Sequence, residues 1–257
     1  MQNLVLVKLG GSVVTFKDKP LTANTEAIDR ISKSLKMLDA PVIIVHGGGS
    51  FGHYWSVQYD MHTKASRYDA HGVSIVHESM IALNQVIVNS MIRSGLNPYG
   101  LQPSVFTSGQ RPITAKIRQL LSMAGSRVTP VTFGDVVYVD RAKYSILSGD
   151  SLMTILAKVL RPSRVIFATN VDGIYSDLES KSLIPRLDVA GGRSVKVSMN
   201  SVADVTGGMK RKITEAFKIA SLGMDVMVVN GLHPERIVAA AKGRPTVGSM
   251  VLKRRRP

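Results

Sequence analysis

The chain has 257 residues, no cysteine and a formal net charge of +15 at pH 7. Its length suits one large α/β domain or two intimately joined lobes, and its ordinary share of hydrophobic residues argues against a disordered chain. The absence of cysteine excludes disulfides, thiolate nucleophiles and cysteine metal sites, and the absence of an apolar run of roughly 20 residues predicts a soluble, cytoplasmic protein.

Short apolar strands and amphipathic helices alternate along the sequence. In the N-terminal half, the predicted elements are a strand at 4–7, a helix at 24–38 capped by Asn24 or Thr25, a strand at 42–45, a helix at 73–92, and short strands at 128–131 and 136–139. In the C-terminal half, they are a helix at 152–160, a strand at 165–168, a helix at 208–222, a strand at 227–229, a helix at 234–241 opened by Pro234, and an edge strand at 246–252. The alternation predicts a mainly parallel sheet with helices on both faces, in one compact unit.

The positive charge suggests an anionic partner, which would be nucleic acid, a membrane surface or a phosphorylated small molecule. Basic residues are scattered along the chain, as on an ordinary solvated surface, and only the tail from Lys253 to Arg256 is a dense cluster. No stripe of aromatic residues accompanies them for stacking on bases. Charge alone therefore leaves the partner open.

Glycine occurs in three clusters at predicted strand ends or helix starts. These are Gly10-Gly11-Ser12, Gly47-Gly48-Gly49-Ser50, and Gly207-Gly208 ahead of Lys210 and Lys212. In parallel α/β sheets, ligands bind at the carboxyl ends of strands, where glycine lets backbone N–H groups approach an anion. One such cluster would be an ordinary turn, but three beside lysine or histidine indicate phosphate binding. No Walker A loop is present, and the match of residues 47–52 to G-x-G-x-x-G is weak evidence for a dinucleotide site.

Over essentially its whole length, the sequence resembles the amino acid kinase superfamily. The matching motifs, in order, are Val7-Lys8-Leu9-Gly10-Gly11-Ser12, His46-Gly47-Gly48-Gly49, Thr169-Asn170-Val171-Asp172-Gly173-Ile174-Tyr175, and Thr206-Gly207-Gly208-Met209 with Lys212. Within that superfamily, Ser50-Phe51-Gly52-His53 is similar to the isopentenyl phosphate kinases of archaeal type. Further segments similar to those enzymes are Phe133-Gly134-Asp135-Val136, Ser148-Gly149-Asp150 and residues 230–236.

The resemblance implies a three-layer αβα sandwich with a mainly parallel central sheet. It implies one amino acid kinase domain over residues 1–257, with an acceptor-binding lobe at about 1–145, an ATP-binding lobe at about 146–257, and a homodimeric assembly. The implied reaction converts ATP and isopentenyl phosphate to ADP and isopentenyl diphosphate, in an alternative mevalonate route to isoprenoids. Magnesium is expected on the ATP phosphates rather than in a protein-held metal site, and neither nucleic acid nor a membrane is an expected partner.

The resemblance also assigns site residues. The catalytic residues would be Lys8, Lys17, His53, Asp150 and Lys212. ATP would be bound by Lys8, Leu9, Gly10, Gly11, Ser12, Gly49, Asp172, Gly173, Ile174, Tyr175, Gly208 and Lys212, and the acceptor by Gly48, His53 and Gly149. Asp150 would hold Lys8 and Lys212 in place, cap the following helix, or do both. Val73, Val76 and Met80 are candidates for lining a tail pocket, or are simply core.

This chemistry suits a site rich in lysine and glycine. A phosphate monoester is already a nucleophile, so no carboxylate base is needed, whereas the repulsion between two phosphates must be offset by cations and backbone donors. Of the histidines, only His53 has a setting that suggests a role, and His46 is expected to be structural.

Two departures and three alternatives stay open. Asn170 stands where the family often has aspartate, and Lys210 or Arg211 could share the role of Lys212. A fosfomycin kinase would use a similar histidine, whereas uridylate, glutamate or carbamate kinases would leave His53 without a role. A basic nucleic-acid-binding protein is the alternative from a different class.

Overall fold

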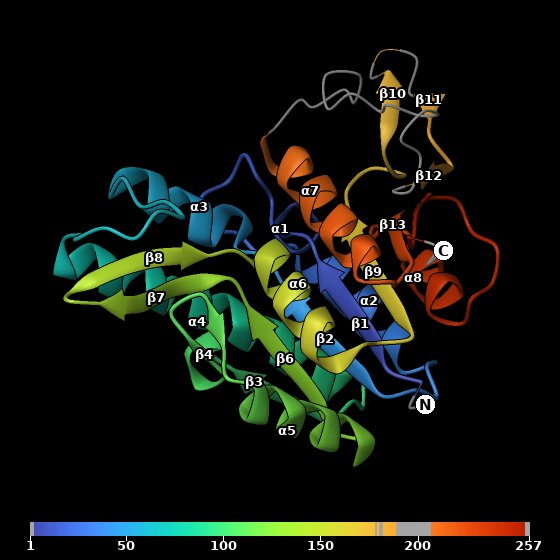
Figure 1. Cartoon of the computed structure of the whole chain (residues 1–257), viewed down its shortest axis with the longest axis horizontal. Coiled ribbons are helices and arrows are strands. Elements are labelled where there is room, and N and C mark those ends of the chain that lie inside the picture. Colours follow the sequence, from blue (N-terminus) through green and yellow to red (C-terminus); the bar gives the residue numbers. More distant parts are fainter. Residues whose placement is uncertain (1–2, 178, 180–181, 189–206, 255–257) are drawn as a thin grey trace.

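The computed structural model describes residues 3–177, 179, 182–188 and 207–254. Thr206 of the fourth motif and Arg255 and Arg256 of the basic tail lie outside this part of the chain. A central sheet carries helices on both faces (Figure 1). Among the described helices, none combines the length and the apolar character that a bilayer crossing requires.

The central sheet has eight described strands in the order β12-β14-β13-β9-β1-β2-β6-β3. They are β1 (Val5–Leu9), β2 (Val42–His46), β3 (Pro98–Leu101), β6 (Thr129–Phe133), β9 (Arg164–Thr169), β12 (Arg186–Asp188), β13 (Val226–Asn230) and β14 (Ser249–Leu252). All neighbours pair in parallel except β13 and β14. The predicted edge position of the last strand is wrong, because β12 pairs with its outer side. Both halves of the chain share this sheet, since β1 pairs with β2 and with β9.

Successive side chains of the central strands point to opposite faces of the sheet and pack into two hydrophobic layers. Val5 and Val7 of β1 pack with α2 (Thr25–Leu35), α4 (Ala70–Arg93) and α8 (Pro234–Ala241). Leu4 and Leu6 pack on the opposite face with α5 (Thr114–Gly125), α6 (Gly149–Leu160) and α7 (Gly207–Ser221). Strands buried on both faces read as continuous apolar runs, as β1 and β2 do. The expected three-layer αβα sandwich is therefore confirmed.

Local capping explains where several helices begin. The Asn24 side chain accepts a hydrogen bond from the Ala27 amide at the start of α2, so Asn24, not Thr25, is the N-cap. Ser148 caps α6 by accepting from the Ser151 amide, which starts that helix three residues before the predicted position. Asp150 is therefore inside the first turn of α6 and is not its cap.

The remaining elements lie outside the central sheet. They are the short helix α1 (Gly11–Val14), α3 (Gly49–Gln58), the 3-10 turn η1 (Pro103–Val105), the small pair β4 (Thr107–Ser108) and β5 (Arg111–Pro112), the hairpin β7 (Asp135–Asp140) and β8 (Lys143–Leu147), and the pair β10 (Tyr175–Asp177) and β11 (Ser182–Leu183). The β7–β8 hairpin lies over α4 and encloses a small apolar cluster that includes Met61, Val76 and Val136. Of these pieces, α1, α3, β7 and β8 contribute residues to the walls of the site.

Candidate active site

Two glycine turns touch through their main chains. The first, residues 10–12, follows β1, and the second, residues 47–50, follows the neighbouring strand β2. A Cβ atom on Gly11 would lie 2.3 Å from the Gly49 amide nitrogen, and one on Gly49 would lie 2.0 Å from Thr15 Oγ1. Gly49 also has φ +49°, a conformation that residues with a side chain rarely adopt. Thr15 Oγ1 joins the turns by donating to the Gly11 carbonyl and accepting from the Ser50 amide. The glycines are thus required by close packing of the backbone.

Four helices begin at this edge of the sheet, at Gly11, Gly49, Gly149 and Gly207. Neither α1 nor α3 has a side-chain cap. Among the described residues, the amides of Gly11, Ser12, Gly48 and Gly49 have no hydrogen-bond partner. Unpaired amides at helix N-termini are donors for anions, and the helix dipole adds to the attraction.

A cavity of about 910 Å³ opens at these helix starts. Its polar end is formed by the glycine turns and by cationic side chains, which are Lys8, Lys17, Arg211 and Lys212, together with His53. Its other end is lined by apolar side chains, which are Val57, Met61, Val76 and Ile146, and Met80 lies where the two ends meet, with its Sδ beside Gly48 and Gly52. The cavity therefore suits an anionic group that carries an apolar tail.

Asp150 is the centre of a buried ionic cluster. Its Oδ1 lies 3.0 Å from Lys8 Nζ and 3.2 Å from Lys212 Nζ, and Oδ2 lies 3.7 Å from Arg211 Nε. Burial lowers the pKa of Lys8 to about 8, although the Asp150 carboxylate acts in the opposite direction. Burial would raise the pKa of Asp150, but the surrounding cations, Lys8 first, outweigh it and hold that pKa well below its usual range. Asp150 is therefore an ionised anchor for lysines and is not a proton acceptor at neutral pH.

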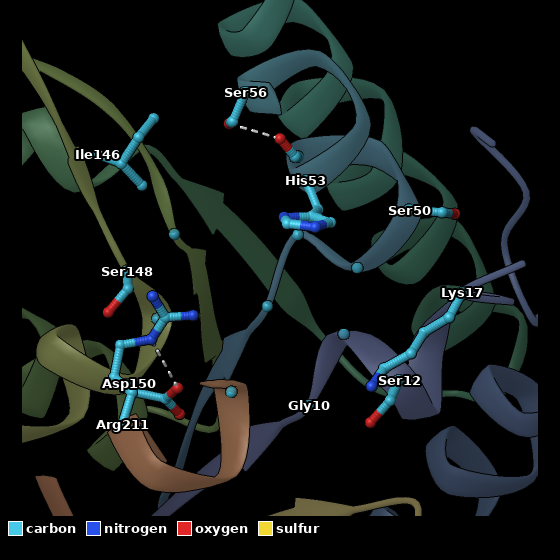
Figure 2. Close-up of a pocket in the computed structure, with 18 of the residues that line it drawn as sticks. Gly10, Ser12, Lys17, Ser50, His53, Ser56, Ile146, Ser148, Asp150 and Arg211 are labelled. Atoms are coloured by element: carbon cyan, nitrogen blue, oxygen red, sulfur yellow. Dashed lines mark hydrogen bonds and ion pairs between the residues drawn. The ribbon is translucent and has the colours of Figure 1, made fainter. Parts of the chain in front are cut away.

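His53 and Lys17 approach the cavity from different walls. His53 lies on α3 with its ring directed into the open space, and Lys17 lies across the cavity on the loop after α1 (Figure 2). Within the described residues, the His53 ring has no hydrogen-bond partner, so both of its nitrogens are available to a ligand. Both side chains belong to exposed residues.

His46 has the structural setting expected from the sequence. Its ring is fully buried, stacks on Phe133, and contacts Asn84 Oδ1 and the Gly47 carbonyl at 3.2 Å each. Burial lowers its pKa to about 4. A neutral imidazole packed beneath the second glycine turn supports that turn from below.

The sequence profile of the amino acid kinase family matches residues 3–230. The chain belongs to the amino acid kinase family. It is 35% identical to an isopentenyl phosphate kinase of Thermoplasma acidophilum over 91% of this chain and 94% of that protein, and 31% identical to one of Methanothermobacter thermautotrophicus over 96% and 98%. The solved product complex of the T. acidophilum isopentenyl phosphate kinase superposes with a TM-score of 0.79 at 31% identity, covering 96% of this chain and 99% of that one.

The amino acid kinase fold brings most of the predicted site residues to one cavity. Those that line it are Lys8, Gly10, Gly11, Ser12, Lys17, Gly48, Gly49, His53, Gly149, Asp150, Gly208 and Lys212. They come from distant parts of the sequence, because the strand order places the carboxyl ends of β1, β2 and β9 side by side. Asn170, the departure from the family pattern, also lines the cavity.

Five predicted nucleotide contacts are not among the residues lining this cavity: Leu9, Asp172, Gly173, Ile174 and Tyr175. The Leu9 and Ile174 side chains are buried in the two core layers, and the Ile174 amide donates to Ser249 Oγ. The Asp172 carboxylate accepts hydrogen bonds from Asn230 and Arg236, which lower its pKa in that order. A motif match locates this loop in the family but does not say which of its atoms face a ligand.

Residues that the motif analysis missed connect the site to its surroundings. Thr15 joins the two glycine turns, and His77 of α4 pairs with Asp135 of β7 at 2.7 Å beside the apolar end of the cavity. Their partners are 35 and 58 residues away in the sequence, so no local pattern could indicate them.

Proposed function

We propose that this protein is an isopentenyl phosphate kinase that transfers the γ-phosphoryl group of ATP to isopentenyl phosphate, yielding isopentenyl diphosphate and ADP for isoprenoid biosynthesis. The observation that carries the proposal is the position of His53. Its free ring faces a cavity that has unpaired amides and a lysine cluster at one end and apolar side chains at the other. An anionic phosphate with a short hydrocarbon tail matches both ends.

The residues divide between the two phosphates. The amides of the first glycine turn, Gly49 and Gly208 bind the ATP phosphates, and the Gly48 amide and His53 bind the acceptor phosphate, with Gly149 beside it. Lys8, Lys17 and Lys212 neutralise the transferring group as it passes in line from donor to acceptor. Fixed cations and amides stabilise the charge that develops in such a transfer.

No general base is part of this mechanism. The attacking oxygen of a phosphate monoester is already deprotonated near neutral pH. Of the three described carboxylates that line the cavity, Asp150 is bound by lysines, Asp135 pairs with His77, and Asp18 is exposed. The cavity therefore has cations and amide donors but, among its described residues, no buried carboxylate that is free to act as a base, which suits a phosphate acceptor rather than a hydroxyl acceptor.

Magnesium belongs to the proposal as a companion of ATP. Within the described residues, no three histidine, aspartate or glutamate side chains are grouped so that they could hold a metal ion. Magnesium binds with few protein ligands and with phosphate oxygens in such sites, which fits a cavity whose buried carboxylates are paired. When bound with ATP, it would offset the negative charge of the phosphates.

The apolar end of the cavity is the proposed tail site. Val76 and Met80 line it, whereas Val73 packs in the cluster beneath the β7–β8 hairpin. The acceptor lobe at about 1–145, the ATP lobe at about 146–257, the homodimer and the cytoplasmic location are further parts of the proposal, and they come from the family resemblance.

A coupled ADP-release assay tests the function across isopentenyl phosphate, dimethylallyl phosphate, fosfomycin and UMP. We expect isopentenyl phosphate to be turned over best, and His53→Ala to lower kcat/KM for it by about ten- to a hundredfold, because a hydrogen bond to a charged group is lost. His71→Ala is the matched control, since His71 is exposed and is not among the residues lining the cavity. Both variants should keep the wild-type unfolding temperature.

Other outcomes of this assay would reject the proposal. Preferred turnover of fosfomycin or UMP would place the chain on another branch of the family. Near-full activity of His53→Ala would remove the argument for the phosphate acceptor.

A further inference from the structure

Arg211 lies next to Lys212 in the sequence but in a different place in the site. Successive residues of a helix are about 100° apart around its axis. Lys212 is buried against Asp150 and the Phe167 ring, whereas the Arg211 side chain is 50% exposed and lines the cavity. Lys210 is exposed and is not among the lining residues. The three consecutive basic residues therefore have three different environments.

The contact between Arg211 and Asp150 is a loose one. Asp150 Oδ1 is shared by Lys8 and Lys212 at hydrogen-bonding distance, whereas Arg211 Nε lies 3.7 Å from Oδ2, beyond that distance. One carboxylate thus faces three cations, and its negative charge is already balanced by the two lysines. An Arg211 guanidinium released from Asp150 would leave no unpaired carboxylate behind.

The guanidinium extends into the cavity in the space between Ser148 and His53 (Figure 2). This is the acceptor side of the site, because Gly149 follows Ser148 and His53 faces it. A guanidinium stays charged at any physiological pH and presents parallel N–H donors that match two oxygens of a phosphate. A lysine at this position would supply only a point charge.

We propose that Arg211 binds the acceptor phosphate from the side opposite His53, and that its loose pairing with Asp150 is the resting position that it leaves when that phosphate arrives. The inference rests on the proposed function, since it takes the acceptor to be a phosphate monoester. The guanidinium holds two phosphate oxygens through its parallel donors and shares one of them with the imidazole, which leaves the third oxygen directed at ATP.

Steady-state kinetics and calorimetry on Arg211→Gln, Arg211→Lys and the control Lys210→Gln test this role. In Arg211→Gln we expect KM for isopentenyl phosphate to rise, and its affinity for the nucleotide-free protein to fall, by about ten- to a hundredfold, because charged hydrogen bonds are lost. KM for ATP should change by less than about twofold, since Arg211 contacts the acceptor. Arg211→Lys should give an intermediate affinity, and Lys210→Gln should match the wild type.

The inference is overturned if Arg211→Gln binds isopentenyl phosphate like the wild type, if only KM for ATP rises, or if Lys210→Gln has an equal effect. A merely structural role would lower the unfolding temperature without separating acceptor from ATP affinity, and that result would also overturn it. Failure of the proposed function has a different signature, which is wild-type protein that releases no ADP when isopentenyl phosphate is added.

Discussion

Burial sets the pH range over which the Lys8 side chain is charged. Its ammonium group lies in the interior at the end of β1, with Asp150 as its counter-ion and Lys212 nearby. Desolvation and the like charge of Lys212 lower its pKa to about 8, and the carboxylate only partly compensates. The motif predicts that Lys8 touches a phosphate, but only the packing explains why its charge is sensitive to pH.

The lowered pKa of Lys8 should appear in the pH profile of the enzyme. As pH rises through about 8, Lys8 of the free enzyme loses its proton, so kcat/KM for ATP should fall. Deprotonation of Lys8 does not unfold the protein in this range. Its pKa is about 8 in the folded protein and 10.5 in the unfolded chain, so between these values the unfolded chain binds more protons than the folded protein. Over that window, the Lys8 contribution to the free energy of unfolding increases with pH.

Measuring kcat/KM for ATP and the unfolding temperature over the same pH series checks this prediction. A kcat/KM that stays level up to pH 10.5 would contradict it. Lys8→Arg, which keeps its charge throughout, should lack the alkaline fall if it remains active.

At the scale of elements, α3 and α5 are not among the predicted helices. The sequence of α3, GSFGHYWSVQ, buries only Ser50 and Phe51 and contains two glycines, so it has neither helical periodicity nor propensity. Its start is decided by contact with the first glycine turn and with α4, and only the fold creates that contact. The buried residues of α5, Ile117, Leu120 and Ala124, do have helical spacing, so this helix was detectable in principle.

The packing of the two glycine turns yields a prediction for Gly49→Ala. The new Cβ would be 2.0 Å from Thr15 Oγ1 in a backbone with φ +49°. We expect the free energy of unfolding to fall by about 1–3 kcal/mol, which is the usual cost of a strained backbone, and ATP affinity to fall with it.

Gly125→Ala at the end of α5 is the control, because nothing lies within 4 Å of the added atom and φ is not positive there. Chemical denaturation of both variants gives the comparison. If Gly49→Ala were as stable as the wild type, close packing of the two turns would not require glycine at this position.

At the scale of the whole molecule, the net charge of +15 is not gathered at the active site. Exposed basic side chains occur on separated elements, for example Arg30 on α2, Lys116 on α5 and Arg141 at the tip of the β7–β8 hairpin. Basic residues spread over separate elements attract polyanions through general charge.

This distribution predicts that duplex DNA binds only through non-specific charge. In a mobility-shift assay, any complex at about 50 mM salt should be lost by about 200 mM, while ADP release with isopentenyl phosphate continues. A complex that survives the higher salt and prefers one sequence would instead favour a nucleic-acid-binding protein.

Local chemistry in the sequence determined most of the alternation of strands and helices and the glycine turns, because periodicity, capping and backbone freedom depend on residues close together in the chain. The roles expected of the lysines and of His53 came from the family resemblance of their motifs. The tertiary structure decided the order of the strands, the inner position of β14 and the helix that carries His53. It also decided that Asp150 is shared among Lys8, Lys212 and Arg211. These features join residues tens to more than a hundred positions apart. Only the packing of both helical layers on one sheet brings such residues within reach of a common ligand.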